Sequence, residues 1–272
     1  MAEKYSGYTK KTCSIFATCL IIIFLFSCRD ETPSHALRAS SPVFSHPYVK
    51  SHLFIPEFTE EYIAQVQSSY DSLIREIKSA RHNFAAQYHD AQCDSVINPV
   101  LAKAKSYLVK KLDEEVLPAW YGTKWAFEGY TDKPLEGCVA CGYFITTPLK
   151  HIGFNLNRFR MAQKYSHDLI RSLCDSDAIA VFPAGELEKR MEGMAGKPDD
   201  IYVVGLDCHV GFLVIRDGKP KFVHSDYCYQ AMVKEEDPFR SAAFMASEGY
   251  VIGSLFSGDG FIANWLTNDT IK

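Results

Sequence analysis

A β-hairpin signal in the second half of the chain places the strongest restriction on its fold. Two apolar stretches flank Asp217-Gly218, a pair that favours the tight two-residue turn of a hairpin. Pairing across this turn puts His209 opposite Asp226 and leaves His224 two residues from that partner. Because strand side chains alternate between faces, we expect the two histidines to be diagonal neighbours on one face, roughly 7–8 Å apart by backbone.

The first half of the chain has helical periodicity instead. Apolar residues recur at three- and four-residue steps after Thr59, which suits the N-cap position, and again from about Pro99 to Leu117. The pattern predicts an antiparallel helical pair within residues 57–118. A further helix is expected to begin near Cys141, and another to run from about Phe159 to Leu173.

Strand-like segments dominate from Ile201 onward, with segments 201–206, 209–215 and 221–226 forming an antiparallel sheet. Helices followed by an antiparallel sheet predict an α+β fold. We expect residues 119–272 to form one domain after the helical region.

The N-terminus has the features of an export signal. Three lysines precede an apolar run over residues 13–27, which is too short to span a membrane comfortably. Leu25-Phe26-Ser27-Cys28 resembles the bacterial lipobox, which implies removal of residues 1–27 and lipidation of Cys28. We expect an exported protein anchored by this lipid in the bacterial cell envelope, with the Pro- and Ser-containing residues 28–56 as a tether. A short signal anchor left uncut is the alternative.

The charge balance argues against a nucleic-acid partner. The whole chain has a net charge of −4, and removal of residues 1–27 takes away three lysines and one glutamate, leaving 26 basic and 32 acidic residues, a net of −6. Nothing in this balance would neutralise phosphates in bulk.

Cys141 is the candidate nucleophile. A cysteine where a loop enters an apolar helix lies among free backbone N–H groups at the positive end of the helix dipole, and both favour thiolate over thiol. Together with His209 on a strand and a third polar group to orient its ring, it would form a cysteine–histidine catalytic pair. The other interpretation of Cys141 is a small buried apolar residue.

Several segments resemble, in the same order, those of the NlpC-type cell-wall peptidases, over about residues 120–230. These are Tyr121–Gly129, Ala140–Phe144, Ala162–Gln163, His209–Phe212 and Phe222–His224. The resemblance implies a reduced papain-like fold and hydrolysis of peptide bonds in peptidoglycan stem peptides, with no metal or other cofactor required.

The resemblance also assigns roles to residues. Cys141 would be the nucleophile and His209 the base, with His224 as the third polar residue and Asp226 as its alternative. The family's upstream tyrosine, which helps the oxyanion site, aligns best with Trp125, and Tyr121 is close enough in sequence to serve. Asp226 is also a candidate for substrate binding. The family usually has Asp before and Ser after the nucleophile, where this chain has Ala140 and Gly142.

Three rival interpretations remain open at this level. Cys138 and Cys141 form a Cys-x-x-Cys pair, the spacing used by exported thiol–disulfide oxidoreductases. Cys138, Cys141, Cys208 and His209 could instead hold zinc. A protein that keeps the peptidase fold but only binds peptidoglycan is the third. The acidic run 235–237 is interpreted as a solvated surface.

Overall fold

The computed structural model describes residues 57–182, 193–194, 196–228 and 230–272. All of these described residues lie in one compact unit. The expected signal peptide, the lipidation site Cys28 and the tether 28–56 fall outside the described residues. Within the described part of the chain, no helix combines the length and apolar character needed to cross a membrane.

The described chain is a mixture of helices and one antiparallel sheet, so the expected α+β class is confirmed. The α-helices are α2 (Glu60–Asp90), α3 (Asp94–Lys111), α4 (Cys141–His151), α5 (Arg158–Ala162), α6 (Ser166–Leu173), α8 (Ala242–Ala246) and α9 (Gly260–Thr267). The strands are β1 (Ile179–Phe182), β2 (Asp200–Leu206), β3 (Val210–Arg216), β4 (Lys219–Ser225), β5 (Val233–Glu236) and β6 (Tyr250–Ser254).

The six strands follow the order β1-β6-β2-β3-β4-β5, and every neighbouring pair is antiparallel. Phe212 pairs with Val223 and Arg216 with Lys219, which is the register expected from the Asp217-Gly218 turn. The hairpin prediction is therefore confirmed. Strands β1, β5 and β6 were not predicted, and β5 places the 235–237 run beside β4.

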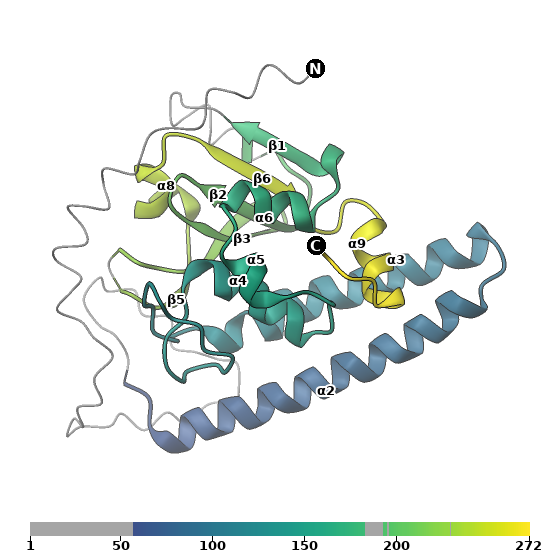
Figure 1. Ribbon diagram of the computed structural model, residues 1–272, viewed down its shortest axis with the longest axis horizontal. Helices are drawn as coiled ribbons and strands as arrows, with labels where there is room; N and C mark the ends of the chain where they lie inside the picture. Colours follow the sequence, from purple (N-terminus) through teal and green to yellow (C-terminus); the bar gives the residue numbers. More distant parts are fainter. Residues whose placement is uncertain (1–56, 183–192, 195, 229) are drawn as a thin grey trace. The chain divides into compact units, whose positions relative to one another are not determined.

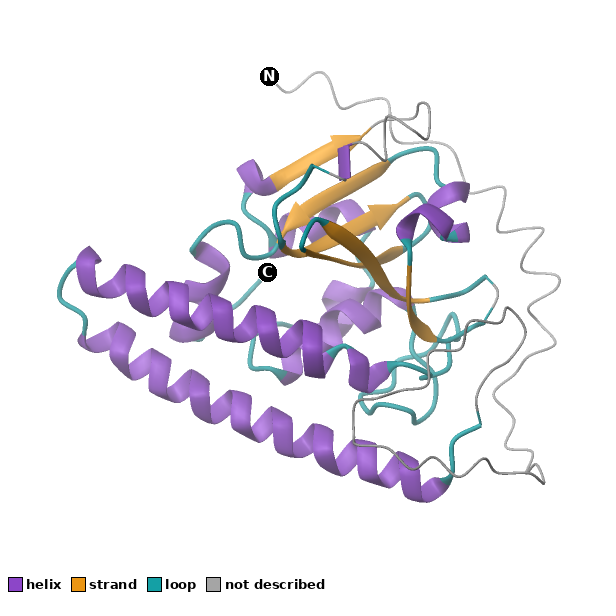
Figure 2. Ribbon diagram, turned by 180° about the vertical axis from the view of Figure 1, so that it is seen from behind, coloured by secondary structure: helices purple, strands orange, loops and turns teal. Residues whose placement is uncertain are grey.

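Both faces of the sheet are covered. Val203 and Phe212 belong to the larger core, which also contains buried side chains of α2, α3, α4 and α9. Val204 and Leu213, one position along, belong to a second core that α8 covers. Figures 1 and 2 show the paired helices α2 and α3 running together alongside the remainder of the fold. The helical pair thus shares its core with the sheet that carries the histidines.

The predicted helices are present, with different ends. Thr59 caps α2 as expected, and its hydroxyl accepts a hydrogen bond from the Tyr62 amide. Helix α3 begins at Asp94, so Pro99 lies inside it; the acidic Asp94 in its first turn favours the earlier start. The single helix expected over 159–173 is two, because the chain turns between Ala162 and Ser166.

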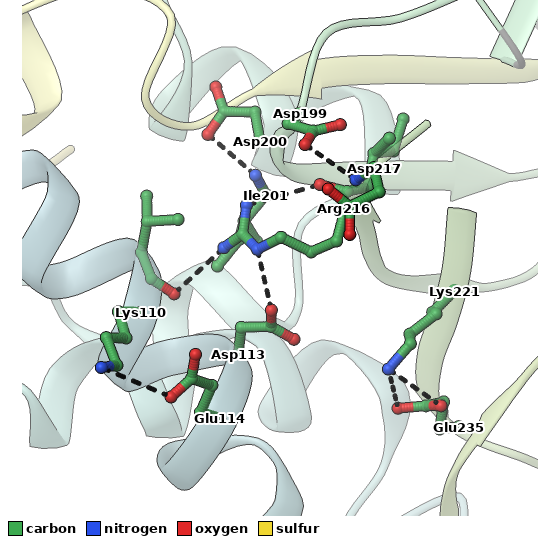
Figure 3. A network of polar contacts seen from close by, with 12 residues as sticks. Lys110, Asp113, Glu114, Asp199, Asp200, Ile201, Arg216, Asp217, Lys221 and Glu235 are labelled. Carbon is green, nitrogen blue, oxygen red and sulfur yellow. Dashed lines mark hydrogen bonds and ion pairs between the residues drawn. The ribbon is translucent and has the colours of Figure 1, made fainter. Parts of the chain in front are cut away.

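Residues outside the β3–β4 hairpin form hydrogen bonds and an ion pair that hold its turn in place. Asp217 and Gly218 both have positive φ angles, 51° and 66°, as a turn with the twist of the flanking strands requires. The carboxylate of Asp199, just before β2, accepts hydrogen bonds from both turn amides at 2.8 and 3.1 Å. Arg216, at the end of β3, is paired at 2.9 Å with Asp113 of the helical region (Figure 3). The hairpin is therefore tied to both β2 and the helices.

Gly142 is the position at which α4 approaches α5 most closely. A Cβ atom there would overlap the carbonyl oxygen of Ala162. A serine in this place, as in the NlpC-type family, would therefore force the two helices apart.

We predict that Gly142→Ala lowers the free energy of unfolding by about 1–3 kcal/mol, because a well-packed contact must be displaced. Chemical denaturation of both proteins measures the difference. Gly196→Ala is the matched control, because no atom lies within 4 Å of the added carbon. Equal losses for the two variants would contradict the close approach of α4 and α5.

Candidate active site

Cys141 is the first residue of α4, as the sequence predicts. The loop before it is held at several points. The amide of Ala140 donates to the Gly129 carbonyl, and the amide of Val139 donates to the Lys124 carbonyl. The buried Ser225 hydroxyl, at the end of β4, donates to the Val139 carbonyl at 2.7 Å. This loop therefore crosses the open end of the β3–β4 hairpin, opposite the turn, and places Cys141 there.

The Cys141 thiol is a shielded group among backbone donors. Burial raises its pKa, and hydrogen bonding from the backbone N–H groups of Val210, Gly142 and Cys141 itself opposes this increase. Val210 directly follows His209. The sulfur therefore lies against the peptide group that joins the candidate base His209 to Val210. The expected stabilisation of a thiolate by backbone N–H groups is present, but burial outweighs it. The neutral thiol is the resting form.

His209 and His224 lie together on one face of the sheet. Their rings are joined by a hydrogen bond of 2.8 Å between Nε2 of His209 and Nδ1 of His224. Both are buried, with 4% and 0% of their surface exposed. The ring of Phe222 stacks on His224 at a centroid distance of 4.2 Å and fills the space beside Gly211, where a Cβ would collide with it. The shared face follows from the hairpin register, as expected.

The second nitrogen of the His209 ring has no such contact. Its Nδ1 is buried and has no hydrogen-bond partner among the described residues. Burial, followed by the charge of His224, holds the pKa of His209 well below its ordinary value. His209 is therefore a neutral imidazole with one ring nitrogen uncommitted, which is the state that a general base requires.

Glu236 is part of this site, and the interpretation of the 235–237 run as a solvated surface is wrong for it. Its carboxylate accepts a hydrogen bond from Nε2 of His224 at 3.0 Å and is paired with Lys234 at 2.9 Å. Burial alone would raise its pKa, but His224, Ser241 and Lys234 hold the pKa at about 2. The signal that was missed is β5 itself, whose alternation puts Lys234 and Glu236 on the same face as His224.

Asp226 has a structural environment. Lys234 contacts its carboxylate at 2.9 Å, and the backbone amides of Cys228 and Gln230 donate to it. Burial would raise its pKa, but the charges of His224 and Lys234 hold it at about 2. His224, not Asp226, makes the hydrogen bond to His209.

The two aromatic candidates lie in different places. The ring of Trp125 is 6.2 Å from that of Tyr227, which in turn lies 5.0 Å from the ring of His209. Tyr121 points elsewhere: its hydroxyl donates to Glu235 at 3.0 Å. Trp125 and Tyr227 thus belong to the surroundings of His209.

The cysteine states bear on the rival interpretations. Cys138 and Cys208 are disulfide-bonded, whereas Cys141 has a free thiol. A redox pair between Cys138 and Cys141 is therefore not formed, and the disulfide state removes two of the four thiolate or imidazole ligands of the suggested zinc site.

We predict that Lys234→Met lowers the free energy of unfolding by about 3 kcal/mol, because the buried Asp226 and the partly buried Glu236 lose their shared cation. Both carboxyl pKa values lie at about 2 in the folded protein, so their stabilisation is present above about pH 4 and is lost as the pH falls towards 2. In the variant this loss should begin at a higher pH. Denaturation curves between pH 2 and 7 measure both effects.

Lys221→Met serves as the control for this prediction. Lys221 is paired with Glu235 at 3.4 Å on the protein surface, and such pairs contribute about 0–1 kcal/mol. A loss in Lys234→Met no larger than in Lys221→Met would show that the buried charges do not depend on Lys234.

Comparisons of the chain with protein-family models, curated proteins and solved structures gave no match.

Proposed function

We propose that this protein is a cysteine peptidase of the papain-like, NlpC type that hydrolyses peptide bonds in peptidoglycan stem peptides. One observation carries the proposal: His209 is hydrogen-bonded to His224, and the Cys141 sulfur lies beside the peptide group that joins His209 to Val210. A thiol, an imidazole and a polar group that orients the imidazole are the components of this chemistry. The stem-peptide substrate rests on the family resemblance of the segments around these residues.

The reaction begins with a neutral thiol and a neutral imidazole. His209 takes the thiol proton on Nδ1 as the sulfur of Cys141 attacks the scissile carbonyl carbon. The backbone N–H of Cys141, at the start of α4, stabilises the oxyanion, a type of contact whose loss costs about 3–4 kcal/mol in other enzymes. Cys141 packs against the larger core, and its sulfur accepts a hydrogen bond from the Val210 amide at the start of β3. The His209 ring contacts Phe222 and His224 on the other face, so the proposed proton transfer requires the two groups to approach each other around this strand end.

The remaining steps return the enzyme to its first state. His209 gives its proton to the leaving amine, and a thioester between Cys141 and the acyl group remains. His209 then removes a proton from water, which attacks the thioester, and the proton passes to the departing sulfur. Trp125 and Tyr227 would line the approach to His209.

The proposed location is the bacterial cell envelope, with a lipid on Cys28 as the anchor. The disulfide-bonded state of Cys138 and Cys208 supports an oxidising compartment. The lipobox resemblance supports the anchor. The second candidate is a protein of the same fold that binds peptidoglycan stem peptides but does not cleave them.

Muropeptides incubated with the purified protein should yield a new fragment, and Cys141→Ala should yield none, because the nucleophile is gone. Mass spectrometry of the digests detects the fragment and identifies the bond. Cys93→Ala is the control, since Cys93 is an exposed free thiol and should leave cleavage unchanged. Identical spectra for wild type and Cys141→Ala would remove the peptidase proposal, and binding without cleavage would favour the inactive binder.

The acid limb of kcat/KM for this cleavage should lie below pH 6.5. Burial lowers the pKa of His209, so the base stays unprotonated at pH values where an ordinary histidine is already charged. A pH profile of initial rates between pH 4 and 8 measures this limb. A midpoint at or above pH 6.5 would contradict the assignment of buried His209 as the base.

A further inference from the structure

Strand β5 extends the site beyond the cysteine and the two histidines. Four side chains form a continuous chain of contacts: His209 to His224, His224 to Glu236, and Glu236 to Lys234, at 2.8, 3.0 and 2.9 Å. We propose that Glu236 is a positioning residue that fixes the tautomers of both histidines and leaves the lone pair of His209 on Nδ1. The catalytic part of this inference rests on the proposed function. The tautomers themselves can be observed without any substrate.

The argument follows the protons along the chain. An ionised carboxylate has no proton to donate, so Nε2 of His224 must donate to Glu236. When both rings are neutral, Nδ1 of His224 is then an acceptor, and Nε2 of His209 must carry the proton between the two rings. Nδ1 of His209 is consequently unprotonated. This is the same buried atom that has no hydrogen-bond partner among the described residues.

The surroundings keep Glu236 in its ionised, accepting form. Lys234 contacts one carboxylate oxygen and His224 the other, and the buried Ser241 hydroxyl also hydrogen-bonds to the group. Asp226, Glu236 and Lys234 together have a net charge of −1. That charge would stabilise the imidazolium formed when His209 accepts a proton.

Asp226 cannot take the same role. Its two carboxylate oxygens accept from the amides of Cys228 and Gln230 and from Lys234. These contacts hold the turn after β4. Glu236 alone contacts the outer nitrogen of His224 among the described residues.

The test replaces Glu236 by glutamine. In Glu236→Gln the side chain keeps a single oxygen, which Lys234 attracts. The amide NH2 then faces His224 as a donor, which reverses the hydrogen bond to His224 and the one between His224 and His209. Nitrogen-15 NMR of labelled histidine side chains should show an unprotonated Nδ1 on His209 in the wild type and a protonated Nδ1 in the variant. The His209 resonances are assigned by their absence in His209→Gln. The kcat for peptide cleavage should fall about 100-fold or more, with KM little changed.

Glu235→Gln is the matched control. Glu235 is the neighbouring residue on β5, contacts Lys221 and Tyr121, and should leave the tautomers and kcat as in the wild type. Wild-type tautomers in Glu236→Gln would overturn the positioning role. If that variant fails to fold, a protonated Nδ1 on His209 in the wild type alone would overturn it. If Glu236→Gln reverses the tautomers but the wild-type protein cleaves no muropeptide, the positioning role of Glu236 is supported and the peptidase proposal is refuted.

Discussion

The antiparallel pairing of β3, β4 and β5 is the constraint on which the candidate site depends. Because side chains alternate along each strand, the register across the Asp217-Gly218 turn puts His209 and His224 on one face. The register between β4 and β5 adds Lys234 and Glu236 to the same face. A slip of one residue in either pairing would turn one partner to the other core and break the chain of contacts.

The cost of burying charge explains why these residues occur together. An isolated carboxylate in the interior would be strongly unfavourable, and its pKa would rise until it became neutral. Lys234 lies between Asp226 and Glu236 and keeps both ionised. The same cation therefore stabilises the fold after β4 and preserves the negative charge of Glu236, which His224 contacts.

The nucleophile is placed by a different part of the chain. Helix α4 packs on β3, and the loop before it is held by Gly129, Lys124 and the Ser225 hydroxyl. The helical pair α2 and α3 contributes to the same core, so it supports the position of α4 without contributing a residue to the candidate chemistry. Burial keeps both the thiol and the imidazole neutral at rest, which favours proton transfer during attack over a preformed ion pair.

The local patterns were sufficient to predict the α+β class, the start of α4 at Cys141 and the β3–β4 register. Each depends on contacts within a short stretch of chain: a turn with two positive φ angles, or a loop that enters an apolar helix. Glu236 could not be recognised in this way. Residues 235–237 resemble any acidic surface segment, and the partial burial of Glu236 follows from the pairing of β5 with β4 across a loop that gives no turn signal. The ionisation of Cys141 likewise depends on how densely distant segments pack around it, because desolvation is a property of the folded interior and not of neighbouring residues in sequence.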